Sequence, residues 1–218
     1  RKLGLEGAAI WDLSTADSVT AIASKIPMLR APIDKATGRP VSLVNAKGLV
    51  ALTFDDGPDP TWTPQILDIL ARENVPGTFF DIGRKAEDSP DLVLQEVNSG
   101  NVVGSHTYSH KDLTQMPQWR ARLEIAAADW VIHGITGRQP TLFRSPYGAA
   151  ELADSQSAAH KDLAATLGLQ PVGWNVDPLD WSQPGVDQIV SNTVNAPGND
   201  LTVLLHDGGG DRSQTVAA

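Results

Sequence analysis

Short, continuous apolar runs alternate with longer amphipathic stretches along most of this chain, from Leu49 to Leu205. Apolar runs without polar alternation indicate strands that are buried on both faces, and helices between consecutive strands indicate parallel pairing. Right-handed crossovers repeated in this way build either an open doubly wound sheet or a barrel. The pattern therefore predicts an α/β fold with a parallel sheet covered by helices.

The apolar and amphipathic stretches give an ordered set of expected elements. Strands are predicted at 49–54, 77–82, 101–104, 141–143, 172–176 and 201–205, and helices at 63–74, 89–99, 118–135, 150–167 and 186–195. A further strand is expected at 7–11, whereas 27–47 is irregular and rich in Pro, Gly and charge. We therefore expect one domain over 48–218, preceded by an extension or linker over 1–47 that packs partly on it.

Composition excludes several classes of protein. The net charge of −9 argues against a nucleic-acid partner, because phosphate binding needs a basic surface. No run approaches the ~18 apolar residues that a membrane helix requires. The absence of cysteine removes thiolate chemistry and leaves His and carboxylates as candidate catalytic groups. The chain begins at Arg1 without a signal segment, so we expect either that a leader was removed or that this is a piece of a longer protein.

Reactive side chains gather at the carboxyl ends of the predicted strands. They are Asp55, Asp56, His106, His110, Arg144, Asp177, Asp180 and His206. The carboxyl ends of parallel strands meet at one edge of the fold, where α/β proteins and barrels build their active sites. Charges scattered over a surface would not follow strand ends, so this arrangement indicates an enzyme.

His106 and His110 are spaced to bind a single metal ion. Two neutral imidazoles and one carboxylate, with solvent in the remaining position, form a typical catalytic zinc site. Asp55 and Asp56 lie at a neighbouring strand end, and a metal would take one carboxylate and leave the other to accept a proton from water. The alternative is a plain turn at Asp55-Asp56-Gly57-Pro58. The spacing alone leaves open which aspartate has which role.

Two further groups suit roles around such a centre. Arg144 is a candidate clamp that holds a catalytic carboxylate ionised, although a surface ion pair is an equal alternative. Asp180 and His206 suggest an imidazole whose second nitrogen is held by a carboxylate, which makes it a plausible acid. Trp181 is more often a core residue, but here it is a candidate wall for an acyl pocket.

These residues, in this order, resemble the NodB-homology polysaccharide deacetylases, carbohydrate esterase family four. The five motifs stand as Thr53-Phe-Asp-Asp-Gly-Pro58, Ser105-His-Thr-Tyr-Ser-His110, Arg144-Ser-Pro-Tyr147, Asp177-Pro-Leu-Asp-Trp181 and Val203-Leu-Leu-His206. The resemblance implies a distorted (β/α) barrel of seven or eight parallel strands with the active site at the C-terminal strand ends.

The resemblance also implies a role for each residue. Asp55 would be the general base, and the metal ligands would be Asp56, His106 and His110. The metal would be zinc, with cobalt or nickel as substitutes. Arg144 would orient Asp55, and Asp180 would tune His206, the general acid. The backbone N–H of Tyr147 would help to bind the oxyanion, and Trp181 and Leu204 would enclose the acetyl methyl group.

The implied substrates are N-acetylglucosamine polymers or oligomers (chitin, chitooligosaccharides or peptidoglycan), with acetate as product. An acetylxylan esterase with the same site is the nearest alternative, and a non-catalytic carbohydrate-binding relative is a second. Specificity would reside in loops such as 58–62 and 111–119, where Trp62 and Trp119 are candidates for stacking on sugar rings. We further expect a monomer with no nucleic-acid partner, located outside the cell or in the cell wall.

Overall fold

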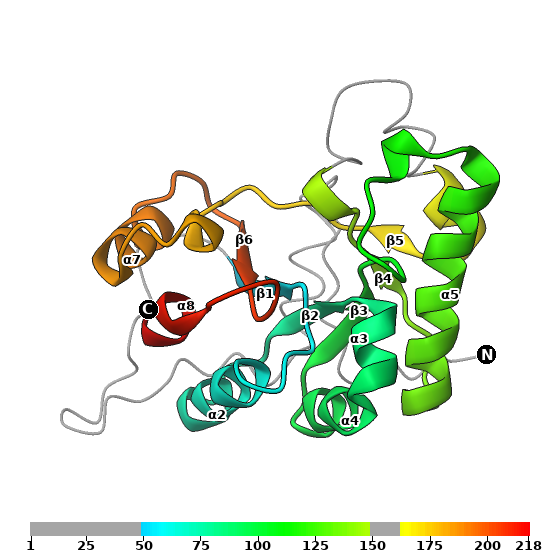
Figure 1. Cartoon of the computed structure of the whole chain (residues 1–218). Helices are drawn as coiled ribbons and strands as arrows, with labels where there is room; N and C mark the ends of the chain where they lie inside the picture. The colour runs from blue at the N-terminus through cyan, green and yellow to red at the C-terminus, as the bar shows by residue number, and fades with distance from the viewer. Residues whose placement is uncertain (1–48, 149–161) are drawn as a thin grey trace.

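The computed structural model describes residues 49–148 and 162–218, and its centre is a curled sheet of six parallel strands (Figure 1). The order of the strands is β5-β4-β3-β2-β1-β6. They are β1 (Val50–Asp55), β2 (Thr78–Asp81), β3 (Val102–Ser105), β4 (Leu142–Phe143), β5 (Gln170–Pro171) and β6 (Leu201–His206). Every pairing is parallel, as the apolar runs predict.

Helices lie around the outside of the sheet (Figure 1). They are α2 (Thr63–Glu73), α3 (Gly83–Asp88), α4 (Pro90–Asn98), α5 (Gln118–Thr136), α7 (Val186–Val194) and α8 (Ser213–Ala217), together with a short helix at 162–166. Single 3-10 turns stand at η1 (Leu113–Gln115), η2 (Pro146–Gly148) and η3 (Asp180–Ser182). Among the described residues, no helix is long and apolar enough to cross a membrane.

Alternation along β1 separates the core from the site. Phe54 points outward, where it stacks on Phe79 at 5.0 Å between ring centroids and packs against α2. Successive side chains of a strand point to opposite faces, so Thr53 and Asp55 point into the curl of the sheet. Both contact Arg144 there. The same strand therefore supplies the outer core and the inner polar site.

One segment connects the two edges of the sheet. Gln170 and Pro171 pair with β4 at one edge, and Val176 forms an isolated bridge to Val203 of β6 at the other edge. The backbone N–H of Leu204 donates to the Val176 carbonyl at 2.9 Å. This closure confirms the predicted distorted barrel.

The described residues form six strands, fewer than the seven or eight predicted. The strand expected at 7–11 lies outside the described residues, as does the extension over 1–47. The helix expected at 150–167 also begins outside them, and its described part is the helix at 162–166.

The predicted strand at 172–176 is wrong as a regular strand. Ladder pairing is confined to Gln170–Pro171 in β5, because the carbonyls of Val172 and Gly173 accept hydrogen bonds from the Arg144 guanidinium. Helix α3 is absent from the predicted set. It packs so closely on α5 that a Cβ at Gly83 would lie 2.7 Å from the Ala128 Cα atom.

Candidate active site

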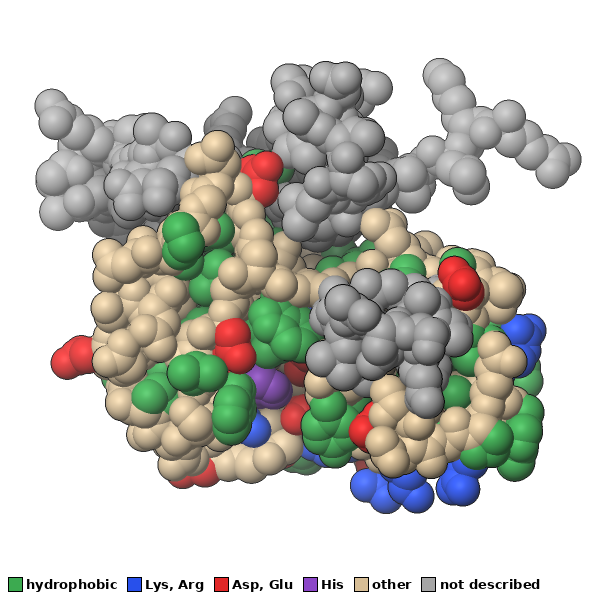
Figure 2. Space-filling model, turned by 90° about the horizontal axis from the view of Figure 1, so that it is seen from above, with side chains coloured by type: hydrophobic (Ala, Val, Ile, Leu, Met, Phe, Trp, Pro, Cys, Tyr) green, Lys and Arg blue, Asp and Glu red, His purple; other side chains and the backbone are tan. Residues whose placement is uncertain are grey.

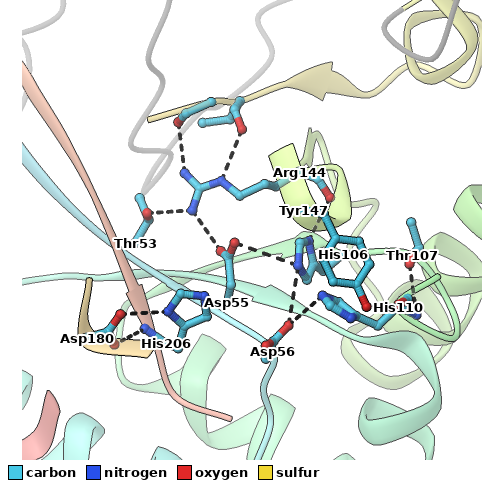
Figure 3. Close-up of polar contacts among 12 residues, drawn as sticks. Thr53, Asp55, Asp56, His106, Thr107, His110, Arg144, Tyr147, Asp180 and His206 are labelled. Atoms are coloured by element: carbon cyan, nitrogen blue, oxygen red, sulfur yellow. Dashed lines mark hydrogen bonds and ion pairs between the residues drawn. The ribbon is translucent and has the colours of Figure 1, made fainter. Parts of the chain in front are cut away.

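The polar side chains at the carboxyl ends of β1, β3, β4 and β6 converge in the structure (Figure 3). The view from above in Figure 2 shows histidine atoms in a hollow between apolar and acidic side chains. Asp55 ends β1, His106 follows β3, Arg144 follows β4 and His206 ends β6. The parallel sheet thus brings together residues from distant parts of the chain.

Asp56, His106 and His110 offer one ligand atom each, and these atoms lie within 4.8 Å of one another. Asp56 Oδ1 is 2.9 Å from His110 Nε2 and 3.5 Å from His106 Nε2. His106 Nδ1 lies 2.8 Å from the Arg144 carbonyl, which can only accept a hydrogen bond. The Nδ1 atom therefore carries the proton, and the lone pair of Nε2 points toward Asp56.

This donor set fits a divalent cation. Asp56 Oδ1 is buried and accepts no hydrogen bond in the described structure, which is costly unless a cation or water completes its contacts. Burial by itself would raise the pKa of Asp56, but the neighbouring imidazoles of His106 and His110 bring this pKa well below its usual value. Asp56 is therefore an ionised carboxylate, and two imidazoles with one carboxylate are common zinc ligands.

Several residues with a left-handed backbone conformation position the candidate metal ligands. Asp56 (φ 72°), Thr107 (φ 65°) and His110 (φ 55°) all have positive φ angles, which non-glycine residues adopt only where their surroundings hold them. The Asp56 carbonyl accepts a hydrogen bond from Lys85 Nζ at 2.8 Å. Gly209 lies so close that a Cβ there would come 2.5 Å from Asp56 Oδ2. With φ at +77°, a side chain at position 209 would be strained and would displace the Asp56 carboxylate.

Asp55 lies beside the candidate metal site but has a separate partner. Its Oδ1 atom accepts a hydrogen bond from Arg144 Nη1 at 2.8 Å, and its Oδ2 atom lies 3.8 Å from His106 Nε2. Asp55 and Arg144 are both almost fully buried. The two adjacent aspartates therefore occupy different environments.

The Arg144 guanidinium is fixed on several sides. Nη1 also donates to Thr53 Oγ1 at 2.7 Å, while Nε and Nη2 donate to the carbonyls of Val172 and Gly173 at 3.2 and 3.0 Å. Its central carbon stands 4.2 Å from the centroid of the Phe80 ring. A guanidinium held in this way cannot turn away from Asp55, which excludes the alternative of a surface ion pair.

His206 and Asp180 form the predicted pair. His206 Nδ1 lies 2.8 Å from Asp180 Oδ1, and the His206 backbone N–H donates to Asp180 Oδ2 at 2.9 Å. Thr215 Oγ1 donates to the same Oδ2 atom at 2.8 Å. Burial lowers the pKa of His206, but the hydrogen bond and charge of Asp180, with the charges of Asp55 and Asp56, raise it above 6.5 overall. Proton donation from His206 is thereby favoured near neutral pH.

Three further predicted residues border this arrangement, and a fourth, Asp177, does not. Tyr147 is exposed, and its ring lies 4.8 Å from that of His110 between centroids. Trp181 is about half exposed in η3, directly after Asp180. Leu204 is buried on β6, two positions before His206 and therefore on the same side of the strand. Asp177 instead accepts a hydrogen bond from the Leu179 backbone N–H at 2.9 Å, within its own loop.

A cluster of buried acids lies beneath the site. Asp81, Glu96 and Asp207 are fully buried, and burial raises the pKa of each, that of Asp81 to about 7. The carboxyl groups of Asp81 and Glu96 interact directly, and the charge of Asp81 raises the pKa of Glu96 further. Two ionised carboxylates can only accept hydrogen bonds, so this pair must share a proton.

Replacing Glu96 by Gln should therefore stabilise the protein at high pH. The folded-state pKa of Glu96 is above the ordinary 4.5, so the contribution of wild-type Glu96 to stability is complete below that pH and is lost as the pH rises through the folded-state pKa. Gln keeps the shape, donates to Asp81 and does not ionise. We expect a Tm several degrees above that of wild type at pH 8 and a much smaller difference at pH 5.

Thermal unfolding at the two pH values measures this effect. Glu73→Gln, at an exposed position of α2, is the matched control and should change Tm little at either pH. A Glu96→Gln variant that is less stable than wild type at pH 8 would show that the carboxyl pair is not under strain.

Several residues of the site carry no signal in the sequence. Lys85 donates a hydrogen bond to the Asp56 backbone carbonyl, and Glu124 of α5 binds the loop that carries His110. Their roles depend on which helix or strand packs beside the site, and the spacing of residues along the sequence does not predict that packing. Gly209 stands in a run of three glycines, which marks close backbone approach but not the group approached.

Comparisons with known proteins agree with this geometry. A family model described as polysaccharide deacetylase matches residues 42–172. The chain is 40% identical over 180 residues to a peptidoglycan-N-acetylglucosamine deacetylase of Bacillus cereus, covering 80% of this chain and 79% of the relative. It is 40% identical over 175 residues to a chitooligosaccharide deacetylase of Bradyrhizobium, covering 77% and 76%. A family 4 carbohydrate esterase from Streptomyces lividans, solved with acetate, superimposes with a TM-score of 0.70 at 36% identity, covering 78% of this chain and 83% of the other.

Proposed function

The chain belongs to the polysaccharide deacetylase family, and on this premise we propose that it hydrolyses N-acetyl groups on N-acetylglucosamine polymers or oligomers and releases acetate. The relatives named for peptidoglycan and for chitooligosaccharides support this substrate class. The observation that carries the proposal is the pair of adjacent aspartates in different environments. Asp56 lies against two imidazoles, and Asp55 lies against a buried guanidinium.

Asp56, His106 and His110 would hold the metal, which we propose to be zinc, with cobalt or nickel as substitutes. When bound there, such an ion supplies Lewis acidity and lowers the pKa of a coordinated water toward ~7. Asp55 takes the proton from the attacking water, and the hydrogen bond from Arg144 keeps the Asp55 carboxylate oriented. His206 protonates the departing amine, and Asp180 holds its imidazole in the required tautomer.

The remaining groups would bind the acetamide. The Tyr147 backbone N–H donates to the oxyanion, a contact typically worth ~3–4 kcal/mol in the transition state. Trp181 and Leu204 enclose the acetyl methyl group, so larger acyl groups are excluded by size. We also propose that the protein acts as a monomer, outside the cell or in the cell wall, where such polymers are found.

Acetate release from a panel of substrates tests this function. Chitooligosaccharides, peptidoglycan and acetylxylan are each incubated with the protein, with and without a chelator. We expect acetate from the N-acetylglucosamine substrates, loss of release with the chelator and recovery when zinc is added. Release from acetylxylan alone would favour the esterase, and binding without release from any substrate would favour a non-catalytic protein.

Glu124 should support the metal site from outside. Its carboxylate accepts hydrogen bonds from the Ser109 backbone N–H at 2.9 Å and from Ser109 Oγ at 2.8 Å, and Ser109 directly precedes His110. Removal of groups that orient a metal ligand typically costs ~10–100-fold in metal affinity. We expect a loss in this range for Glu124→Ala, measured by calorimetric titration of the metal-free protein with zinc.

Two variants separate this effect from a general loss of structure. Glu124→Gln keeps both contacts with Ser109, because an amide can accept from the backbone N–H and donate to the hydroxyl, and it should restore most of the affinity. Glu87→Ala removes an exposed hydrogen bond to Tyr108 in the same loop and should change the affinity little. Equal affinities for Glu124→Ala and wild type would contradict this role.

A further inference from the structure

A second hollow opens on the surface at the start of α5, away from the catalytic residues. It has a volume of about 340 Å³ and lies between α5 and the helix at 162–166. Its lining residues are Gln118, Trp119, Arg122, Asp162, Leu163 and Thr166. We call it the Trp119 hollow. Its volume is within the range of small-molecule sites, about 300–1,000 Å³.

The hollow has a firm floor. Leu163 is buried and belongs to a core cluster with Ala121 and Ile125 of α5. Arg122 Nη1 donates to Thr166 Oγ1 at 3.0 Å and so ties the two helices together across the hollow. Leu163, Arg122 and Thr166 are therefore held in place before any ligand arrives, which reduces the entropic cost of binding.

Its chemistry suits a sugar ring. Trp119 is 69% exposed, so its indole presents a large apolar surface to solvent without a partner in the described structure. Arg122, Asp162 and Gln118 stand around this surface and offer both hydrogen-bond donors and acceptors. A pyranose ring has the complementary form, an apolar C–H face with hydroxyl groups along its rim. An uncharged ligand also agrees with lining residues of both signs.

Its position suits a polymer that also reaches the active site. A helix that follows a parallel strand starts near the carboxyl edge of the sheet, and this edge carries the catalytic side chains. Helix α5 starts eight residues after His110 and follows β3 (Figure 1). The helix at 162–166 leads into β5, at the far end of the strand order from His206. The wall of the hollow that the start of α5 forms therefore lies toward the edge of the sheet that carries the catalytic residues.

We propose that the Trp119 hollow is a distal site that binds one sugar ring of the polymeric substrate. This inference rests on the proposed function, because it needs a polymer of sugars. The affinity of the protein for its substrate then depends on chain length. Long chains occupy the hollow and the catalytic centre together, whereas a disaccharide occupies the catalytic centre alone. The second contact then adds to the first as in other multivalent binding.

Trp130 provides a matched control. It is 67% exposed on the same helix, but it lies 11 residues from Trp119, about 16 Å along the helix axis, and does not line the hollow. We expect Trp119→Ala to raise the KM for long chitooligosaccharides on the order of tenfold, with kcat and the kinetics on the disaccharide unchanged. Trp130→Ala should leave all of these parameters as in wild type, and Trp119→Phe should restore part of the loss.

Binding without turnover completes the test. The same substitutions are placed in an Asp55→Asn background, and cosedimentation with insoluble chitin measures affinity without acetate release. Equal effects of Trp119→Ala and Trp130→Ala, an equal effect on short and long chains, or no effect on either would each overturn the distal site. These outcomes are distinct from failure of the proposed function, in which wild-type protein releases no acetate from any N-acetylglucosamine substrate.

Discussion

The Asp55→Asn variant is expected to lose about 10³-fold or more in kcat while it binds metal as tightly as wild type. General-base catalysis typically contributes ~10²–10⁴-fold, and an amide cannot take the proton from water. The structure explains why metal binding should survive. The candidate ligand set contains Asp56 and excludes Asp55, and the amide of the variant still offers an oxygen to Arg144 Nη1, which donates to Asp55 at 2.8 Å in the wild type.

Two measurements on one preparation check this prediction. Acetate release gives kcat, and titration of the metal-free variant with zinc gives the affinity. A variant that lacks the Arg144 guanidinium is a useful comparison with Asp55→Asn. In that variant the Asp55 carboxylate would remain buried beside the apolar Phe80 ring without its charge partner. If Asp55→Asn turned over substrate normally, or if it lost its metal, the two aspartates would have to exchange roles.

The His110→Ala variant is expected to lose both metal and activity. His110 Nε2 is the nearest ligand atom to Asp56 Oδ1, at 2.9 Å, and its removal leaves a two-residue site. Loss of an outer-shell group already costs ~10–100-fold in affinity, so loss of a ligand should cost at least about 100-fold. Activity at low metal concentration should then fall in proportion to the metal bound.

Zinc titration and activity at several zinc concentrations distinguish a weakened site from a damaged fold. A variant with the native fold should regain part of its activity at high zinc, whereas an unfolded one should not. His133→Ala, at an exposed position of α5, removes a histidine far from the site and serves as the control. Tight zinc binding by His110→Ala would show that the ion is held elsewhere.

The parallel fold is predictable from the chain because its signal is local. Each apolar run is long enough to specify a buried strand, and β1, β2, β3 and β6 lie within one or two residues of their predicted bounds. Strand β5 is the exception. The guanidinium of Arg144 donates hydrogen bonds to the backbone carbonyls of Val172 and Gly173. A side chain that is distant in sequence therefore ends the strand ladder.

The site is predictable to the extent that its residues follow strand ends. Asp55, His106 and His206 do so, and the structure places them together. Glu124 and Lys85 do not, because each acts from the flank of a helix whose packing depends on the whole sheet. The left-handed conformations of Asp56 and His110 are equally invisible, since neither residue is a glycine.

The pairing of β1 with β6 makes catalytic competence depend on the last strand of the sheet. Asp55 stands opposite His206 in this register, near the end of the chain, whereas the candidate metal ligands are all present by residue 110. Partial unfolding that separates β6 from β1 would therefore remove the acid and leave the candidate metal ligands on the strands that remain. Loss of activity under mild denaturing conditions should therefore precede loss of metal binding and report directly on release of the final strand.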